Sequence, residues 1–570
     1  MPARARRPYN ERVNPAAPLP RLARLRAWAD TGPAARSRTD LPRVWGASWS
    51  TIERLRDDRP LRRDEPLSWL LTAALTALAF VIRFPNLRMA PYIEFDETYY
   101  AKEAWSVLTF GYARAWPPGD TVNPMLNDGA DPLSVVLSTA DRVVHPMLAK
   151  WLIAGGIHLF GFNPFGWRFG SLIVGCLLVA AVVRLARRLA RSTLIGGLAG
   201  LFICVDGLSV VMSRIALLDI FEAFFTVAAV AVVVRDRDWF RERLARYLEK
   251  RGQPNLDGHF GPVLWWRPWR LLAGVLFGLA CGCKWNAMYV LAIMGVVTLA
   301  FDWHARRTAG ARGATWRSLL VDGPLSFIYL VIVAIVSYVG TWASWFATSE
   351  GSFRQWGAEN PDTLSVRLLG KPLASLWAYH VDIWKFHTGE FMSSVTHPWD
   401  AKPWGWLVMR RPISIAVDHV PSGVDGCHAR LPSDCVRVVL AIGTPFLWWL
   451  AALAIVAGLF FWIVGRDWRF AVPVLGAAAT WVGWFPNADR PLFFFYAIMI
   501  IPFTATILAL CLGQILGPPS AGRRRRRGAI IVTVCTVLIV ANFAFIYPIL
   551  TDQLMTDIGW GLRIWFRTWA

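Results

Sequence analysis

The chain has 570 residues, of which 55% are hydrophobic and only 17% are charged, and its mean hydropathy is +0.39. A soluble protein of this size carries more charge and lacks apolar runs of about 20 residues, the length that crosses a bilayer core. The composition therefore excludes a soluble enzyme and predicts a polytopic helical membrane protein. The 32 Trp residues exceed what interface belts need, so some are available to line a groove for an isoprenoid or a sugar.

The distribution of positive charge predicts the orientation of the chain. The net charge is +21, and arginine concentrates in the N-terminal tail and in internal clusters at 184–191, 235–251, 306–317 and 523–527. Basic loops of this kind mark the cytoplasmic side of membrane proteins. Nucleic-acid binding, the rival interpretation, is disfavoured because every cluster abuts an apolar run.

The N-terminal part is expected to begin in the cytoplasm and then to form the catalytic module. Residues 1–66 are interpreted as a basic, mostly disordered cytoplasmic tail. Residues 67–346 are the N-terminal transmembrane module, with an outer loop at 84–166 that includes an interfacial helix ending near Phe160. Its predicted spans lie at about 67–83, 168–184, 194–234 (two spans), 271–301 (a hairpin of two short helices with Lys284 at its outer tip) and 323–346.

The C-terminal part is expected to repeat this alternation of loop and spans. Residues 347–437 form an extracytoplasmic loop, 438–550 the C-terminal transmembrane helices and 551–570 an extracytoplasmic tail. The predicted spans lie at about 438–465, 470–486, 492–514 and 529–550. The predicted fold class is thus an all-α polytopic membrane protein with about 11 transmembrane helices and two large extracytoplasmic loops.

Two of the eight cysteines stand apart from the others. Cys427 and Cys435 lie in the polar outer loop, close enough in sequence to close a small disulfide ring, which requires an oxidising compartment. The other six lie in or beside apolar runs and are interpreted as small core residues. No second Cys or His pair at ligand spacing accompanies the loop cysteines, so no metal site is predicted.

The adjacent acids Asp96 and Glu97 are the strongest candidates for chemistry. They lie among aromatic residues just beyond the first span, where a carboxylate can deprotonate a hydroxyl that attacks a lipid-linked substrate. A sugar on a lipid phosphate has a good leaving group, so one base suffices and the transfer inverts the sugar, unlike hydrolysis with two opposed carboxyls. The alternative for these two residues alone is a solvated acidic turn.

Cations outside the basic clusters are candidates for binding the departing phosphate: Arg168, Lys284 and Arg490. Lys284 has an alternative, which is to snorkel from the hairpin tip to the interface. Arg214 and Asp219 are interpreted as a structural pair. Because most charges lie at span ends, an interfacial enzyme is favoured over a coupled transporter, whose ionisable groups lie near mid-bilayer.

The ordered motifs resemble the protein O-mannosyltransferases, in their bacterial branch, over roughly residues 67–550. The matching motifs are Asp96-Glu97 after the first span, His145-Pro146-x-x-Ala149-Lys150, Arg168 in Trp-Arg-Phe, Ser213-Arg214-Ile215-x-x-Leu218-Asp219, Lys284-Trp285, His397-Pro398-Trp399 and Arg490-Pro491-x-Phe493-x-Phe495-Tyr496. The loop between the seventh and eighth spans is much shorter than in eukaryotic relatives. It lacks their inserted β-trefoil module, so acceptor selection by such a domain is not implied.

The resemblance implies a GT-C membrane fold and transfer of mannose from a polyprenyl-phosphate donor to Ser or Thr of proteins crossing the membrane. By this resemblance Asp96 and Glu97 are the essential acids, with Asp96 the favoured base, and Arg168 is a functional arginine near them. His145, His397 and Trp399 are further candidates for substrate contact, against helix capping and loop packing as the alternatives.

The expected setting is the bacterial plasma membrane, with the N-terminus cytoplasmic and the site extracytoplasmic. Expected partners are polyprenyl-phosphate-mannose, secreted or membrane acceptor proteins, the secretion translocon and membrane lipids, with no cofactor beyond the lipid-linked donor. Two alternatives stay open: a transferase that uses the same donor type on a lipid or cell-wall glycan, and a non-enzymatic membrane transporter.

Overall fold

The computed structural model describes residues 50–56, 65–430 and 433–570. Most of the predicted disordered tail, residues 1–66, lies outside the described residues. Within that stretch the structure describes the short helix α2 (Thr51–Arg56). Arg56 pairs with Glu249 and lies 3.4 Å from Glu242, both near the end of α11 (Asp219–Lys250), so α2 docks on one end of the helix bundle.

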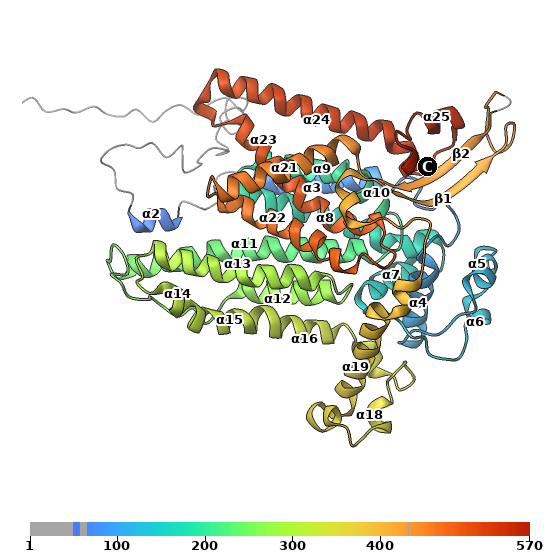
Figure 1. Cartoon of the computed structure of the whole chain (residues 1–570), viewed down its shortest axis with the longest axis horizontal. Coiled ribbons are helices and arrows are strands. Elements are labelled where there is room, and N and C mark those ends of the chain that lie inside the picture. The colour runs from blue at the N-terminus through green and yellow to red at the C-terminus, as the bar shows by residue number, and fades with distance from the viewer. Residues whose placement is uncertain (1–49, 57–64, 431–432) are drawn as a thin grey trace, which may run out of the picture.

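Long apolar helices make up the bundle, and they run side by side in Figure 1. Among the described residues, six are long and apolar enough to cross a membrane: α3 (Glu65–Arg83), α8 (Pro164–Ala190), α13 (Ala287–Thr308), the run Ala314–Gly340, α21 (Pro445–Ile463) and α24 (Arg523–Leu550). Shorter apolar helices are α7 (Leu148–Phe160), α9 (Thr193–Cys204), α12 (Pro268–Cys281) and α23 (Ile501–Leu516). The predicted polytopic helical fold is therefore confirmed, while the total of about 11 spans stays a prediction.

The run Ala314–Gly340 is not a uniform α-helix. It consists of α14 (Ala314–Arg317), α15 (Gly323–Phe327) and α16 (Val333–Gly340), separated by π-helical turns at Ser318–Asp322 and Ile328–Ile332. The predicted hairpin at 271–301 is confirmed: α12 and α13 are antiparallel neighbours, and Lys284 lies in the turn between them. The last pair of core helices, α22 (Trp468–Val482) and α23, packs against α21.

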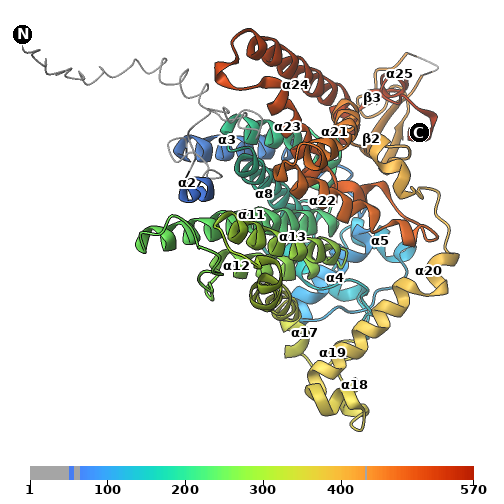
Figure 2. The ribbon, with the colours of Figure 1, turned by 60° about the vertical axis from the view of Figure 1, so that its left-hand side comes forward.

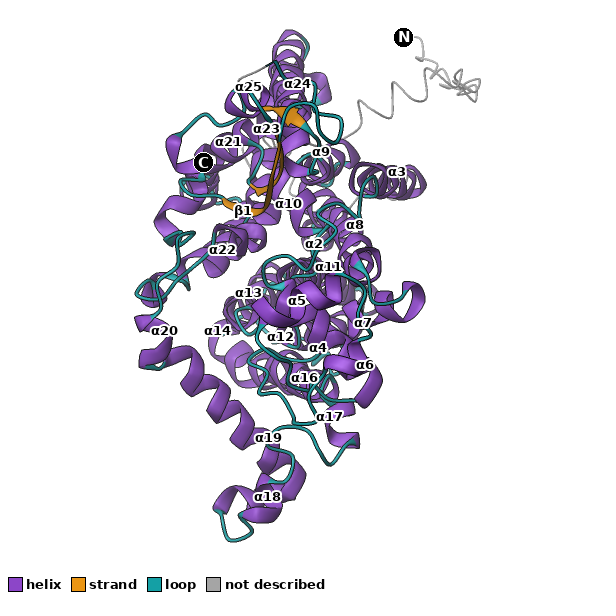
Figure 3. Ribbon diagram, turned by 90° about the vertical axis from the view of Figure 1, so that its right-hand side faces the viewer, coloured by secondary structure: helices purple, strands orange, loops and turns teal. Residues whose placement is uncertain are grey.

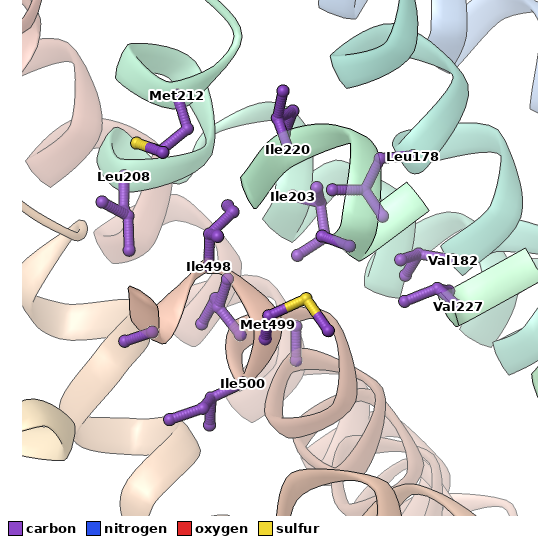
Figure 4. Packing of buried hydrophobic residues seen from close by; sticks show 14 of the residues in the cluster. Leu178, Val182, Ile203, Leu208, Met212, Ile220, Val227, Ile498, Met499 and Ile500 are labelled. Atoms are coloured by element: carbon purple, nitrogen blue, oxygen red, sulfur yellow. The ribbon is translucent and has the colours of Figure 1, made fainter. Parts of the chain in front are cut away.

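The centre of the bundle is a continuous apolar core (Figure 4). It joins α8, α9 and α11 to the short helix α10 (Gly207–Met212) and to the 3₁₀ turn Phe494–Met499. Ile203, Met212 and Ile498 are fully buried there. Helices that are apolar on every side are expected to lie inside a bundle, and α23 fits this rule, since nearly all of its residues are buried.

Small residues allow a close helix contact between α12 and the run that follows α13. An added Cβ at Gly274 would lie 1.9 Å from the carbonyl oxygen of Tyr329, and one at Gly278 would lie 2.4 Å from that of Ala334. The spacing Gly-x-x-x-Gly lets two membrane helices approach until their backbones touch. These two glycines therefore position α12 and with it the Lys284 turn.

A buried charge network joins α11, α12 and α13 at the end of the bundle that bears α2. Arg267 lies 2.5 Å from Asp236 and 3.2 Å from Asp302, and Arg270 lies 2.9 Å from each of the same two carboxylates. All four side chains are almost completely buried. Each arginine is therefore neutralised by carboxylates from two neighbouring helices.

A three-stranded antiparallel sheet interrupts the otherwise helical chain, with strand order β1-β2-β3. The strands are β1 (Ile413–Val420), β2 (Cys435–Ala441) and β3 (Met555–Thr556), and Cys435 pairs with both Val420 and Thr556. Residues 438–441, predicted to begin a span, are thus the end of β2, and the helix begins only at Pro445. The predicted disulfide between Cys427 and Cys435 is confirmed, and the other six cysteines are free.

The two large loops contain short helices. In 84–166 these are α4 (Glu97–Phe110), α5 (Gly119–Asn127), α6 (Pro132–Val135) and α7. In 343–394 they are α17 (Ala343–Ala347), α18 (Trp356–Glu359), α19 (Leu364–Thr388) and α20 (Glu390–Ser394). The last helix, α25 (Asp557–Gly561), follows β3. These elements gather at one end of the bundle (Figures 1 and 2).

Candidate active site

The turn that presents the acidic pair has an unusual backbone. Phe95 has a φ of 49°, in the left-handed region that a residue with a Cβ rarely adopts. Its ring packs edge-on against Phe493 and Phe495, with centroid distances of 5.6 and 5.7 Å, and lies 6.2 Å from the ring of His397. This packing maintains the strained turn and fixes the direction in which Asp96 leaves the chain.

Glu97 is fully buried, and its two oxygens are occupied. Arg168 donates to both through Nε and Nη2, each at 2.8 Å, in a forked contact. The backbone N–H groups of Ala216 and Glu94 donate to the same carboxylate at 3.0 and 3.2 Å. Glu97 is therefore committed to structure, which argues against the prediction that it acts in catalysis.

Arg168, the partner of Glu97 in this ion pair, also has a structural role. Besides Glu97, its guanidinium donates to four backbone carbonyls of the loop, those of Leu87, Met89, Ala90 and Tyr92. Only 2% of its surface is exposed. The prediction that Arg168 binds the donor phosphate conflicts with this geometry, because its donors are already used to fold the loop that precedes Asp96.

Asp96 differs from Glu97 both in its exposure and in its hydrogen bonding. Its side chain is partly exposed, it does not cap α4, and among the described residues it accepts no hydrogen bond. Burial raises the pKa of Asp96 to about 7; Lys284 nearby lowers it, while Asp219 and Glu103 raise it further. A carboxylate that is half protonated near neutrality and has free lone pairs is suited to accept a proton.

Lys284 is the closest cation in this environment, and it is almost fully buried. Its ammonium lies 2.8 Å from Asp219 Oδ1 and 4.1 Å above the ring of Tyr496. The alternative in which Lys284 snorkels to the interface is thus wrong. The predicted pairing of Arg214 with Asp219 is wrong as well, because Asp219 pairs with Lys284.

Arg214 instead organises the end of the first span. It donates to the carbonyl oxygens of Arg83, of Pro85 at 2.7 Å and of Asn86 at 2.9 Å. Arg214 and Asp219 are only five positions apart in the sequence, but the chain between α10 and α11 directs their side chains to different partners.

Histidines and a second cation complete a basic cluster next to Lys284. The rings of His145 and His387 lie 5.2 Å apart, and Arg490 donates to the carbonyl of His387 at 3.3 Å. Burial lowers the pKa of His145 well below its usual value and that of His387 to about 4, and both are lowered further by Lys284 and Arg490. The Nε of Arg490 is buried and has no protein partner.

This cluster has the composition of an anion site. It combines two permanent cations, Lys284 and Arg490, with two neutral imidazoles, and the Nε of Arg490 is a buried donor without a protein partner among the described residues. The predicted residues Lys284, Arg490 and His145 come together here with Asp96 close by. His387 was not predicted as a site residue; it lies on α19 among other polar loop residues, with no motif to mark it.

The His-Pro-Trp motif forms a turn beside the acidic loop. His397 packs against Phe493 at 4.9 Å between ring centroids, and its Nδ1 accepts from the N–H of Trp399. Next to this turn is a cavity of about 350 Å³, lined in part by Lys402, Trp404, Trp406, Arg410 and Arg411. Lys402 donates to the carbonyl of Arg490 at 3.1 Å. His397 and Trp399 thus support the acidic loop and adjoin, without entering, the basic cluster.

Within residues 50–56, 65–430 and 433–570, no group of three or more His, Cys, Asp or Glu side chains is arranged to hold a metal ion.

The fold and the site together define a class of protein, a membrane-embedded glycosyltransferase of the GT-C fold. The same fold is seen in the S. cerevisiae protein O-mannosyltransferase Pmt1–Pmt2 complex bound to the sugar donor. The TM-score is 0.63 at 12% identity, covering 88% of this chain and 93% of that one.

Sequence comparisons narrow the class to a family. Residues 146–348 match the model described as dolichyl-phosphate-mannose-protein mannosyltransferase, and residues 372–569 match the C-terminal four-transmembrane region of protein O-mannosyltransferase. The chain is 38% identical to the polyprenol-phosphate-mannose–protein mannosyltransferase of Mycobacterium tuberculosis, covering 94% of this chain and 98% of that one. It is 32% identical to the enzyme of the same name from Corynebacterium glutamicum, over 87% and 92%. The chain therefore belongs to the protein O-mannosyltransferase family.

Proposed function

We propose that this enzyme transfers mannose from polyprenyl-phosphate-mannose to Ser or Thr hydroxyls of secreted proteins, with inversion at the anomeric carbon and with Asp96 as the general base. The names of its relatives support the donor and the protein acceptor. The observation that carries the assignment of the base is the contrast between the two acids. Glu97 is buried and fully bonded, whereas Asp96 is partly exposed, accepts no hydrogen bond from the described residues and lies beside the basic cluster.

In the proposed reaction the acceptor oxygen attacks the anomeric carbon on the face opposite the phosphate. Asp96 takes the hydroxyl proton as the new C–O bond forms. The bond from the anomeric carbon to the phosphate oxygen breaks, and its electron pair leaves with polyprenyl phosphate. No acid is required, because a phosphate is a stable leaving group.

The basic cluster would stabilise the charge that develops on the departing phosphate. Lys284 and Arg490 supply positive charge, and His145 can donate one hydrogen bond while neutral. The single N–H of neutral His387, on Nε2, is already donated to the carbonyl of Val144 at 2.9 Å, so His387 positions the cluster through its contacts with His145 and Arg490. Asp219 and Tyr496 hold the ammonium of Lys284 in place before the donor arrives. These groups are positioned in advance, which is how an enzyme favours the transition state over the bound substrate.

The proposed orientation places the site on the extracytoplasmic face. The basic segments at 306–317 and 523–527 include α14 and the start of α24, which lie at the left end of the bundle in Figure 1, while α4 and α5 lie at the right end. Cytoplasmic loops carry the excess of Arg and Lys. Acceptors would then reach Asp96 as they leave the secretion translocon, and the donor would reach it through the surrounding lipid.

The test is mannose transfer in membranes that contain the full-length protein. Labelled polyprenyl-phosphate-mannose and a Ser/Thr/Pro-rich peptide serve as substrates, and Asp96→Asn is compared with the wild type at equal expression. The matched control is Asp120→Asn, an exposed acid on α5. We expect the Asp96 variant to lose about 10²–10⁴-fold in rate, the usual contribution of a general base, and the control to keep full activity.

Two outcomes would change the proposal. Full transfer by Asp96→Asn would remove Asp96 as the base. Absence of transfer to peptide by the wild type, with label appearing in glycolipid or cell-wall glycan, would assign a different acceptor to the same donor chemistry.

A further inference from the structure

We propose that α19 is a membrane-interface helix, which lies in the headgroup region on the site's side of the bilayer with a stripe of leucine and aromatic side chains inserted into lipid. The stripe consists of Leu373, Trp377, Trp384 and Phe391, the last in α20. This inference rests on the fold and is independent of the proposed chemistry.

The direction of α19 is the first argument. The apolar helices of the bundle run across Figure 1, whereas α19 runs down the picture at the end that bears α4. Figure 3, which views that end directly, shows α19 lying at full length beside the bundle, with α18 at its far end. A helix perpendicular to the spans and at their end lies in the plane of the membrane surface.

The second argument is that α19 has three chemically distinct faces. One face, with Leu376, Tyr379 and Ile383, is buried against Trp342 and Trp345 at the end of the last span before the loop. A second face is polar: Asp382 pairs with Arg142, and Lys385 is exposed. The third face is the apolar stripe, and in the described residues no protein element covers it.

Spacing and exposure define the stripe. Leu373, Trp377 and Trp384 follow one another at intervals of four and seven residues, which places them on one side of α19, and Phe391 lies in α20, beyond the non-helical Gly389. Trp377 is 59% exposed, Trp384 58% and Phe391 63%. Side chains of this size left in water would form an exposed apolar patch of the kind that marks an interaction site.

Lipid is the occupant that the surroundings favour. Helix α16, whose Tyr338 contacts His380 of α19, also exposes apolar side chains: Ile335 is 53% exposed and Val336 67%. Tryptophan is enriched at the boundary between hydrocarbon and water, and lysines flanking such a helix, here Lys371 and Lys385, favour anionic headgroups. A second copy of the chain would have to cover the apolar stripe and complement the polar face of α19 at the same time. The charges on α19 do not form such a self-complementary pattern.

The placement has a consequence for the site. The inner side of the same helix bears His380, which stacks on Trp285 at 5.6 Å, and His387, which contacts His145. The surface that rests on lipid and the histidines of the basic cluster therefore belong to one rigid element. Anchoring α19 in the interface would hold His387 at the depth where a lipid-linked phosphate lies.

The experiment measures depth, so it does not depend on activity. Single cysteines at Leu373→Cys and Trp384→Cys, on the stripe, are compared with Ala378→Cys and Lys385→Cys, on the polar side, in the full-length protein in phosphatidylethanolamine–phosphatidylglycerol vesicles. Each is given a nitroxide label, and collisions with oxygen and with a water-soluble nickel chelate are measured. The wild type is labelled in parallel to correct for Cys535, the one partly exposed free cysteine among the described residues.

We expect the stripe labels to collide with oxygen and not with nickel, and the polar-side labels to show the reverse. Trp384 and Lys385 are adjacent in the chain, so a difference between them cannot come from local unfolding. Equal nickel accessibility at all four sites would overturn the inference. Shielding of the stripe from both reagents would overturn it too, since it would indicate protein contact such as a second copy.

Discussion

At the scale of single residues, Asp96 and Glu97 show that neighbours in sequence can have opposite roles. The turn at Phe95 and the first turn of α4 direct the two carboxylates to different surroundings, one toward Lys284 and the other toward Arg168. One acid is left able to react, while the other orders the loop that precedes it.

The raised pKa of Asp96 predicts how transfer depends on pH. A base acts only when it is deprotonated, so kcat/KM should fall about tenfold for each pH unit below about 7 and level off above it. His145 and His387 titrate well below this window, and the donor phosphodiester does not titrate in it. Initial rates from pH 5 to 8.5 measure the profile. A flat profile would mean that Asp96 is not the titrating base.

The Glu97–Arg168 pair predicts a defect in stability. Arg168→Ala leaves a buried carboxylate without its partner, which costs about 3–5 kcal/mol. We therefore expect a lower melting temperature of the detergent-solubilised protein, partly recovered in the double variant Glu97→Gln/Arg168→Gln, which buries no charge. If Arg168→Ala instead melted like the wild type and only raised KM for the donor, the phosphate-binding role predicted from the sequence would be restored.

Some of these residues could be recognised from the sequence, and others could not. Asp96, Lys284 and Arg490 stood out because they are charged residues that lie outside the basic clusters and next to the ends of apolar runs. The roles of Glu97 and Arg168 were not recoverable, because they depend on carbonyls gathered from residues 89–92. The partner of Asp219 was missed for a related reason: it comes from a turn 65 residues further along the chain.

At the scale of elements, the glycines of α12 make a prediction about packing. Gly274→Leu would place a side chain where the backbone of Tyr329 now lies, so α12 must move away from its neighbour and take the Lys284 turn with it. We expect a loss of stability of about 1–3 kcal/mol or more, typical of overpacking, together with reduced transfer. Gly295→Leu on α13 is the matched control, because no atom lies within 4 Å of its added Cβ.

The measurement is the melting temperature of each variant in the same detergent, with transfer assayed at a temperature where both are folded. A Gly274 variant as stable and as active as the Gly295 control would show that the close approach of α12 does not matter.

Helices were predicted correctly where the apolar run was long, and the prediction failed where the apolar run was short. The α12–α13 hairpin followed from length and charge. Residues 438–441 were assigned to the start of a span, but they form the end of β2, because four apolar residues in a row do not distinguish a buried strand from the start of a helix. The helices within the outer loop, α19 above all, were hidden by a kink at Gly370 and by mixed composition.

At the scale of the whole molecule, composition alone fixed the class of fold, since little but a helical bundle can bury so much apolar sequence in a bilayer. Composition could not reveal how the end of the bundle that bears the candidate site is built. Loop 84–166, the Lys284 turn and the end of α19 converge there from three distant parts of the chain, so the site exists only when the bundle is complete.

The buried network of α11, α12 and α13 bears on how the protein is made. Arg267 and Arg270 open a helix of only 14 residues, and their counter-charges, Asp236 and Asp302, lie on the helices before and after it. Each of these charges is costly when it is buried without a partner. During synthesis α12 can pair with Asp236 of α11 as soon as it is made, but Asp302 arrives only with α13, so the network is complete only when all three helices are in place.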